Sequence, residues 1–251
     1  SVIDETKTAL GGRLLKRWPS QPLLDITELK QRQDAIGYFI DNALPRAEMI
    51  ATLNQTTDLE RLINRIAGGN ALPLELMALS RTLEKIPRIM ELLSAAPFDL
   101  LKNMLHSQPE VIALIAGAIH PEPASLVGEG GVIKPGFSEE LDNVRSISKN
   151  ARQYLAGMER AEQEKTGIKS LKIGYNQVFG YYIEISKSNI GQAPETYIRK
   201  QTLSTGERYY TPELKEYEAT ILNAKERIET LERILYHQIC QQIALYRVPI
   251  Q

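Results

Sequence analysis

The sequence has few of the residues from which disulfides and metal sites are built. Cys240 is its one cysteine, so no disulfide can form within the chain and nothing calls for an oxidising compartment. The three histidines, His106, His120 and His237, are too widely spaced to indicate a cluster of metal ligands. We therefore expect this chain to hold no metal ion and no cofactor.

Motifs of nucleotide and hydrolytic chemistry are missing as well. The chain has neither the G-x-x-x-x-G-K-[ST] loop that binds phosphates nor the G-x-S-x-G turn that presents a nucleophilic serine. The adjacent carboxylates Glu139 and Glu140 would diverge on a helix, so they do not form a catalytic pair. These absences predict that the chain is not itself an enzyme.

Long apolar runs and secretion signals are absent too. No stretch approaches the length of a membrane-spanning helix, so we expect no membrane partner and a cytoplasmic location. The opening residues, Ser1 to Asp4, read as the interior of a protein, and we expect a piece of a longer chain. Total charge does not discriminate among functions, because 30 basic residues face 31 acidic ones.

The first half of the chain has the apolar spacing of short helices. Asp25 indicates the start of one helix, and an apolar stripe predicts another over residues 58–67. Pro73 would begin a third helix, and Pro87 breaks or bends the pattern that follows. Two more short helical stretches are expected within residues 98–117.

Two longer helices follow the glycine-rich residues 128–137, which predict a loop. From 138 to 165, and again from 212 to about 245, apolar residues recur at steps of three and four. That spacing is typical of helices that pair along a seam. The seam residues are Leu141, Val144, Ser148, Ala151, Leu155 and Met158 in the first helix, and Leu214, Tyr217, Ile221, Ala224, Ile228, Leu231 and Leu235 in the second.

Between these helices the pattern changes to the two-residue period of β-strands. Residues 179–185 are a strand by alternation, and residues 170–175 and 196–203 are further candidates. Asn176-Gln177 would form a hairpin tip because asparagine tolerates a positive φ. We predict a mainly α protein with a small antiparallel β-sheet. Two long antiparallel helices would hold the sheet on a stalk, away from the helical body.

Positive charge gathers locally in the expected sheet region. Residues 166–208 contain six basic and three acidic residues, which fits contact with phosphates. On charge alone, an ordinary solvated face is the favoured interpretation, because the excess is small and includes no long basic run. Asn176 and Gln177 could donate amide hydrogens to phosphate, although asparagine in a turn often serves the backbone. Tyr175, Tyr181 and Tyr182 could stack on bases, but in a small sheet packing is the favoured interpretation.

Several longer strings resemble the MutS family of mismatch-recognition proteins. Residues 166–187, TGIKSLKIGYNQVFGYYIEISK, and residues 197–218, YIRKQTLSTGERYYTPELKEYE, are similar to the clamp of bacterial MutS proteins. Residues 11–25, 58–67 and 129–142 resemble the core, or lever, region. These unrelated strings occur in the family's order over nearly the whole chain, which makes the resemblance specific.

The resemblance implies a helical core/lever domain at 1–135, a clamp domain at 136–228 with its β-tip at about 168–208, and a returning lever helix at 229–251. It implies non-sequence-specific binding to the backbone of double-stranded DNA, coupled to an ATPase domain that this chain lacks. Family members form dimers around DNA, bind ATP and Mg²⁺, and act with other mismatch repair proteins. The implied location is the bacterial cytoplasm, in association with the nucleoid.

The resemblance also places the DNA contacts in two loops. The implied DNA-binding residues are Asn176, Gln177, Ser204, Thr205, Gly206 and Arg208. Family members often read Lys-Asn-Ala at positions 204–206, so one phosphate-binding charge is missing in this chain. Arg208 would either contact DNA or anchor the turn to Glu213 or Glu216. Arg199 and Lys200 lie on opposite faces of a strand, so at most one faces DNA.

A second interpretation of the residues is a structural or protein-interaction module. In that case the paired long helices form an assembly surface, and the β-tip binds a protein partner. The near-neutral charge and the seamed helices favour this alternative. Salt-sensitive DNA binding would indicate the first function, and self-association without DNA binding would indicate the second.

Overall fold

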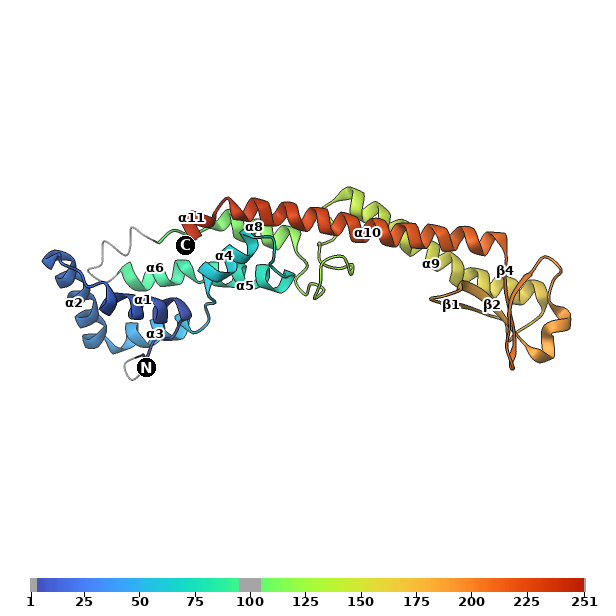
Figure 1. Cartoon of the computed structure of the whole chain (residues 1–251), viewed down its shortest axis with the longest axis horizontal. Coiled ribbons are helices and arrows are strands. Elements are labelled where there is room, and N and C mark those ends of the chain that lie inside the picture. Colours follow the sequence, from blue (N-terminus) through green and yellow to red (C-terminus); the bar gives the residue numbers. More distant parts are fainter. Residues whose placement is uncertain (1–3, 95–104, 251) are drawn as a thin grey trace. The chain divides into compact units, whose positions relative to one another are not determined.

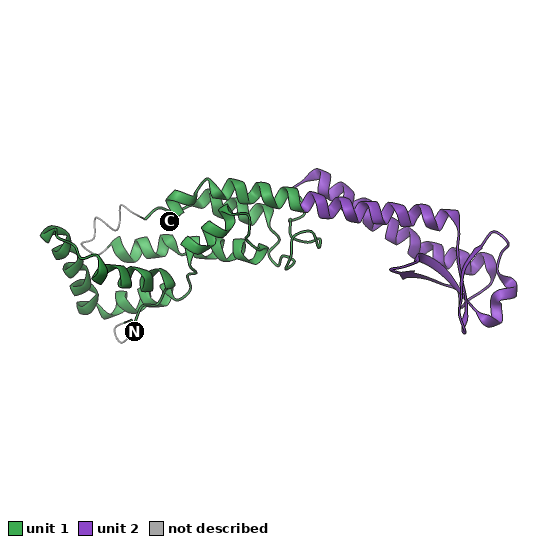
Figure 2. Cartoon of the chain, viewed as in Figure 1, with its two compact units in different colours: residues 1–137, 233–251 green, residues 138–232 purple. Residues whose placement is uncertain are grey.

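The computed structural model describes residues 4–94 and 105–250, and the chain divides into two compact units (Figures 1 and 2). Unit 1 consists of residues 1–137 and 233–251, as far as they are described, and unit 2 of residues 138–232. None of the described helices is both long and apolar enough to cross a membrane.

Unit 1 is built from short helices. They are α1 (Ala9–Ser20), α2 (Ile26–Asp41), α3 (Ala43–Leu53), α4 (Leu59–Ala67), α5 (Pro73–Leu83), α6 (Ile86–Ser94), α8 (Pro109–Ala118), α11 (Arg247–Ile250) and the end of α10 (Pro212–Ala244). Asp25 caps α2, where its carboxylate accepts from the N–H groups of Thr27 and Glu28. Asp58 caps α4 in the same way, and Pro73 is the first residue of α5. These starts confirm the sequence predictions.

Pro87 separates two helices, as expected. It lies in the first turn of α6, where the missing N–H of proline costs nothing, and α5 has already ended at Leu83. One of the two helical stretches expected within residues 98–117 is α8. The other would lie before Pro109, and residues 98–104 of that stretch are outside the described part of the chain; residues 105–108 are not helical. Residues 128–137 form the predicted loop.

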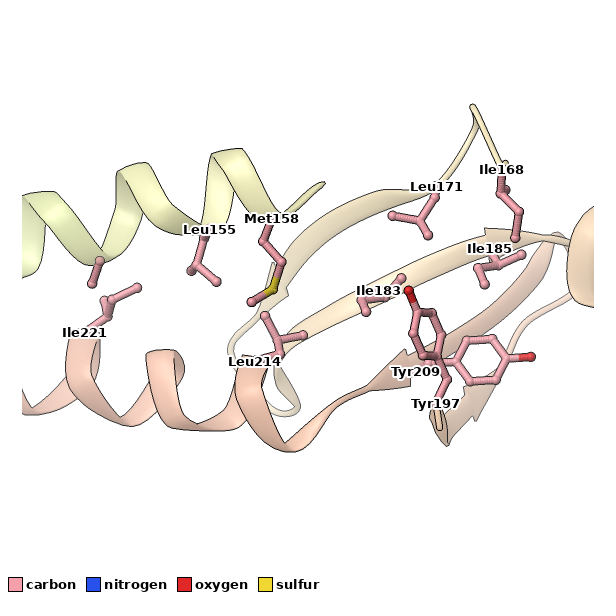
Figure 3. Packing of buried hydrophobic residues seen from close by; sticks show 11 residues of the cluster. Leu155, Met158, Ile168, Leu171, Ile183, Ile185, Tyr197, Tyr209, Leu214 and Ile221 are labelled. Atoms are coloured by element: carbon pink, nitrogen blue, oxygen red, sulfur yellow. The ribbon is translucent and has the colours of Figure 1, made fainter. Parts of the chain in front are cut away.

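In unit 2, helix α9 (Glu139–Thr166) and the first part of α10 are antiparallel and pack along the predicted seam (Figure 3). Leu155 and Met158 of α9 share a hydrophobic cluster with Leu214 and Ile221 of α10. Each fully buried leucine or isoleucine contributes about 1.5–3 kcal/mol. The pair is also joined by ion pairs and a ring stack. Arg145 lies 3.0 Å from Glu232, Arg227 pairs with Glu140, and the Tyr154 and Tyr217 rings stack at 4.0 Å.

The seam of α10 changes position near its end. The predicted steps hold as far as Leu231, which is buried, but Leu235 is only half-buried and Tyr236 is buried instead. An α-helix has 3.6 residues per turn, so a strict seven-residue seam drifts around the helix as it lengthens. α10 contributes to both units. The boundaries expected after residues 135 and 228 lie two and four residues before the observed unit boundaries.

The residues between α9 and α10 form one antiparallel sheet of four strands in the order β1-β2-β4-β3. The elements are β1 (Lys172–Asn176), β2 (Gly180–Ser186), the 3-10 helix η1 (Lys187–Gln192), β3 (Ile198–Thr202) and β4 (Gly206–Tyr210). Three strands match the predicted ones within two residues. β4 was missed, because residues 203–208 were interpreted as a loop. Its inward positions include the charged Glu207, which conceals the alternation.

One face of the sheet closes the hydrophobic core of unit 2. Ile183, Ile185 and Tyr209 are buried there together with Leu171, against the ends of α9 and α10 (Figure 3). Side chains alternate along each strand, so the neighbours of these residues lie on the opposite face. The core therefore fixes which side chains and which turns of the sheet remain accessible.

Candidate nucleic-acid interface

The turn between β1 and β2 is held by one of its own side chains. Asn176 ends β1, and its Oδ1 accepts hydrogen bonds from the N–H groups of Val178, at 2.8 Å, and Phe179, at 3.2 Å. Gly180 supplies the positive φ, at 74°, and every described residue with a positive φ is a glycine. The expectation that Asn176 itself adopts a positive φ is therefore wrong. Gln177 is exposed, as a contact residue must be.

This β1–β2 turn lies against the start of α10. The Glu218 carboxylate accepts a hydrogen bond from the N–H of Tyr181 at 3.0 Å and pairs with Lys215 at 3.0 Å. Lys200 donates from Nζ to the carbonyl oxygen of Phe179, and burial, together with Lys215, lowers the pKa of Lys200. A carboxylate beside the turn weakens its attraction for phosphate.

The turn between β3 and β4 has the same length as the β1–β2 turn, with three residues between its strands. The N–H of Leu203 donates to the carbonyl oxygen of Gly206 at 2.8 Å, which leaves Ser204 and Thr205 exposed at the apex. The N–H of Lys187 donates to the Thr205 carbonyl oxygen at 2.9 Å and ties the start of η1 to this turn. Gly206 is buried, so of the predicted residues in this loop only the two hydroxyl side chains are accessible.

Arg208 is not a turn residue. It lies within β4, its Nε is 2.9 Å from Glu184, and its guanidinium stacks over the Tyr182 ring at 4.1 Å. The predicted anchors Glu213 and Glu216 are therefore wrong, because strand pairing places Glu184 of β2 directly opposite Arg208. With 19% of its side chain exposed and its charge paired, Arg208 supports the sheet.

The neighbouring strand β3 is interrupted by a β-bulge between Arg199 and Gln201. Arg199 pairs with Glu207 at 3.2 Å, and Tyr209 donates to the same carboxylate at 2.5 Å. These partners hold the pKa of Glu207 below its usual value, with the hydrogen bond from Tyr209 as the largest cause. Arg199 is engaged within the sheet. Lys200 donates a hydrogen bond to the carbonyl oxygen of Phe179 in the β1–β2 turn. Because the bulge interrupts β3, simple alternation does not predict the directions of the Arg199 and Lys200 side chains.

The register places the two predicted contact turns at opposite ends of the sheet. Asn176 pairs with Gly180 at one end of the β1–β2 ladder, whereas Ser186 pairs with Gly206 at the far end of the β2–β4 ladder. Six residue steps along β2 separate these pairs, which corresponds to about 20 Å. The structure therefore does not bring Asn176 and Gln177 together with Ser204 and Thr205.

Polar side chains gather at the end of the sheet that carries the β3–β4 turn. Asn189 donates from Nδ2 to the Ser170 hydroxyl at 3.0 Å and to the Ser186 hydroxyl at 3.3 Å. The Ser186 hydroxyl also lies 3.3 Å from those of Ser170 and Ser188. We define the sheet-end cluster as Lys169, Ser170, Ser186, Lys187, Ser188, Asn189, Ser204 and Thr205.

The two lysines of this cluster, Lys169 and Lys187, are exposed, and neither forms an ion pair with the described residues. Both lysines belong to the local positive charge seen in the sequence, but no sequence pattern assigns them to a site. Ser204 and Thr205 were predicted, whereas Ser170, Ser186, Ser188 and Asn189 were missed, because they converge from segments that only the strand register brings together. Hydroxyl and amide donors beside unpaired lysines can bind phosphate oxygens without reading base edges.

The remaining candidates for site chemistry are the histidine, cysteine and acidic side chains. In residues 4–94 and 105–250, no group of three or more His, Cys, Asp or Glu side chains lies close enough to hold a metal ion. Cys240 is 3% exposed, and burial raises its pKa to about 11. A thiol that stays protonated at neutral pH is a poor nucleophile and a poor metal ligand.

Comparison with known proteins gives one consistent family. The family model described as MutS domain III matches residues 1–251. The chain is 46% identical to the DNA mismatch repair protein MutS of Dehalococcoides mccartyi over 245 residues, covering 96% of this chain and 29% of that protein. Identity is 44% with the protein of the same name from Salinibacter ruber, covering 97% and 27%. It is 43% with that from Methanosarcina mazei, covering 100% and 29%. The chain spans less than a third of the length of these curated relatives.

Proposed function

The chain belongs to the MutS family, and from that premise we propose that it acts in DNA mismatch repair by holding the backbone of duplex DNA. The sheet-end cluster is the proposed contact. The observation that carries this proposal is the convergence of three serine hydroxyls and an asparagine amide with two unpaired lysines. The hydroxyls of Ser204 and Thr205, which are exposed at the turn apex, complete the cluster.

The chemistry of the cluster suits a sequence-independent grip. Phosphate contacts use hydroxyl, amide and main-chain N–H donors together with cations, and they carry no base information. The cations here are lysines, which attract phosphate as point charges and do not form the two-pronged contacts by which arginine reads guanine. The arginines of the sheet, Arg199 and Arg208, are already paired with Glu207 and Glu184. Binding should therefore be strongly salt-dependent.

The proposal extends to the longer protein that the relatives represent. In it, α9 and α10 would act as levers that couple the DNA grip to an ATPase domain, which binds ATP and Mg²⁺ outside these residues. Dimerisation around DNA, cooperation with other mismatch repair proteins and a cytoplasmic, nucleoid-associated location belong to the same proposal. We assign no catalytic role to this segment. ATP hydrolysis by the purified 251-residue chain would contradict that assignment.

The test is fluorescence-anisotropy titration of a duplex oligonucleotide at low and at physiological salt. Two matched double variants add the same charge at opposite ends of the sheet: Ser204→Asp with Thr205→Asp, and Asn176→Asp with Gln177→Asp. We expect the first pair to raise Kd about tenfold or more at low salt and the second pair to leave it within about threefold. The reverse pattern would move the interface to the β1–β2 turn. No binding by the folded, unmodified chain would contradict the proposal that this segment holds DNA by itself.

A protein-interaction function is the second candidate, and an exposed apolar stripe on α2 favours it. Ile26, Leu29, Ile36 and Ile40 follow helical spacing, and their side chains are 69%, 39%, 55% and 64% exposed. Analytical ultracentrifugation would test it, with Ile36→Glu and Ile40→Glu as the paired change. Self-association that these substitutions abolish would support an assembly role. A monomer at all concentrations, unaffected by them, would count against it.

A further inference from the structure

The cations of unit 2 fall into two classes according to their partners. Most are paired or hydrogen-bonded within the unit: Arg145, Lys165, Arg199, Lys200, Arg208, Lys215, Lys225 and Arg227. Within residues 138–232, all of which are described, six cations have no such partner. Three of these lie in or beside the sheet-end cluster, namely Lys169, Lys172 and Lys187. The other three, Lys149, Arg152 and Arg160, all belong to α9.

These three residues share one face of α9. Their positions differ by three and eight residues, so Lys149 and Arg160 are three full turns apart and Arg152 lies between them. All three side chains are exposed. Gln153 and Ala156, which are also exposed, lie on the same face between Lys149 and Arg160. We call Lys149, Arg152 and Arg160 the α9 basic stripe.

The stripe is separate from the helix-packing seam. The seam residues of α9 include Ser148, Ala151, Leu155 and Met158, which are buried. Lys149 directly follows Ser148 in the sequence, and Arg152 directly follows Ala151, so both are turned away from the seam. The charges of the stripe are therefore not needed to hold α9 against α10. At 1.5 Å per residue the stripe extends about 16 Å, a length comparable to several phosphate spacings along one DNA strand.

Acidic residues do not neutralise the stripe. Glu159, beside Arg160 in sequence, accepts a hydrogen bond at 2.7 Å from the main-chain N–H of Ile173. Glu164 lies one turn beyond Arg160, at the end of α9. Unpaired exposed cations in a row are free to attract a polyanion, because no internal ion pair must break first.

From this arrangement we propose that the α9 basic stripe is a second contact for the phosphate backbone of duplex DNA, additional to the sheet-end cluster. The inference rests on the proposed DNA-holding function and extends it along the helix. The duplex then touches unit 2 at the sheet and along α9, so the salt dependence of binding includes both sets of cations. Lysine and arginine that contact phosphates contribute charge and no sequence preference.

The first test is the salt dependence of binding by the 251-residue chain. The stripe variant combines Lys149→Gln, Arg152→Gln and Arg160→Gln. The matched control combines Lys30→Gln, Arg17→Gln and Arg81→Gln, which removes the same charge from exposed positions in unit 1. The plot of log K against log salt should become shallower by about two to three for the stripe variant. The control should keep the slope of the unmodified chain.

The second test locates DNA directly. An iron chelate that generates hydroxyl radicals is attached at Ala156→Cys, in the middle of the stripe, or at Asn150→Cys, which is exposed on another face of α9. The native Cys240 is buried, so we expect it not to react with the reagent. Cleavage of the duplex from position 156, and little from position 150, is the expected result. Equal or absent cleavage from both would overturn the stripe contact.

The outcomes separate this inference from the proposed function. If the Ser204→Asp and Thr205→Asp pair weakens binding while the stripe variant behaves like its control, the sheet-end grip stands and the stripe contact fails. If the unmodified, folded chain does not bind duplex DNA at low salt, both fail. If the stripe variant instead loses affinity for an acidic polypeptide, such as polyglutamate, and not for DNA, the stripe serves a protein partner and this inference is wrong.

Discussion

The carboxylate of Glu218 in α10 accepts a hydrogen bond from the main-chain N–H of Tyr181 in β2, at 3.0 Å. The same carboxylate fills the space beside Gly180, where a Cβ atom would come within 2.2 Å of it. Helix and sheet are thus joined at a position that only glycine can occupy without displacing Glu218.

Gly180→Ala should therefore destabilise unit 2. The side chain would be forced into the left-handed region, at about 1–2 kcal/mol, and would push Glu218 away from the N–H of Tyr181. Urea unfolding followed by circular dichroism measures the loss. Gly157→Ala, on an open face of α9, is the control and should stabilise the chain by about 0.5–1 kcal/mol. Equal effects of the two changes would contradict this account.

Asn176 should matter for its acceptor oxygen. Asn176→Ala removes the acceptor for the N–H groups of Val178 and Phe179 and should cost about 1 kcal/mol. Asn176→Asp keeps an oxygen at that position and should retain most of the stability. The comparison uses the same unfolding measurement. A loss of the same size for both variants would show that the amide nitrogen is the important group.

The buried end of the α9–α10 pair should be sensitive to removal of its cation. Glu232 is fully buried and lies 3.0 Å from Arg145, so Arg145→Ala leaves a carboxylate without that partner and should cost about 3 kcal/mol or more. Arg145→Met combined with Glu232→Leu should recover most of that loss. Lys165→Ala breaks the exposed pair with Glu162 and should change stability by less than about 1 kcal/mol. The free energy of unfolding, measured with urea for the unmodified chain and the three variants, tests these expectations. A loss for Arg145→Ala no larger than that for Lys165→Ala would contradict them.

Asp58 should make part of the stability of unit 1 depend on acid pH. The hydrogen bond from Arg13 is the main cause that lowers the pKa of Asp58 in the folded chain. Because the folded pKa lies below the unfolded one, this stabilisation is complete above about pH 4 and is lost as pH falls through the folded pKa. Asp58→Asn keeps a capping side chain but cannot ionise.

The unmodified chain should therefore exceed Asp58→Asn in stability at pH 7, by about 0.5–1 kcal/mol because Arg13 is half exposed. The difference should shrink below pH 4 and vanish when Asp58 is protonated in both states. Unfolding free energies measured from pH 2.5 to 7 provide the comparison. A difference that stays constant over this range would rule out the ion pair as its source.

Cys240 should be unreactive while the chain is folded. Burial raises its pKa to about 11, and its side chain is 3% exposed. At pH 8 a thiol-specific reagent should modify the unfolded chain rapidly and leave the native chain unmodified, because thiolate and access are both lacking. Mass spectrometry of timed samples, with and without urea, measures the difference. Rapid labelling of the native chain would show that the end of α10 opens readily.

Local periodicity was sufficient to predict the helical part of this fold. The seams of α9 and α10 depend on steps of three and four residues within one segment, and Leu141 to Met158 lie where those steps place them. The helix starts at Asp25 and Asp58 could also be predicted from the sequence, because a capping carboxylate accepts hydrogen bonds from the N–H groups two or three residues later.

The arrangement at the sheet could not be predicted in the same way, because it depends on pairing between distant segments. Whether Arg208 meets Glu184 or Glu213 is decided by the register of β4 against β2. A strand with Glu207 on its inward side does not show the simple apolar alternation that would have disclosed it. The sheet-end cluster needs the same register, since Ser170 and Ser186 are sixteen residues apart.

Because about 20 Å separates the two turns of the sheet, changes at one end share no contacts with changes at the other. Substitutions at Gln177 and at Thr205 should therefore be thermodynamically additive, so that a combined variant multiplies their separate effects on Kd. A departure from additivity would require one rigid ligand that contacts both turns at once and so couples the two substitutions.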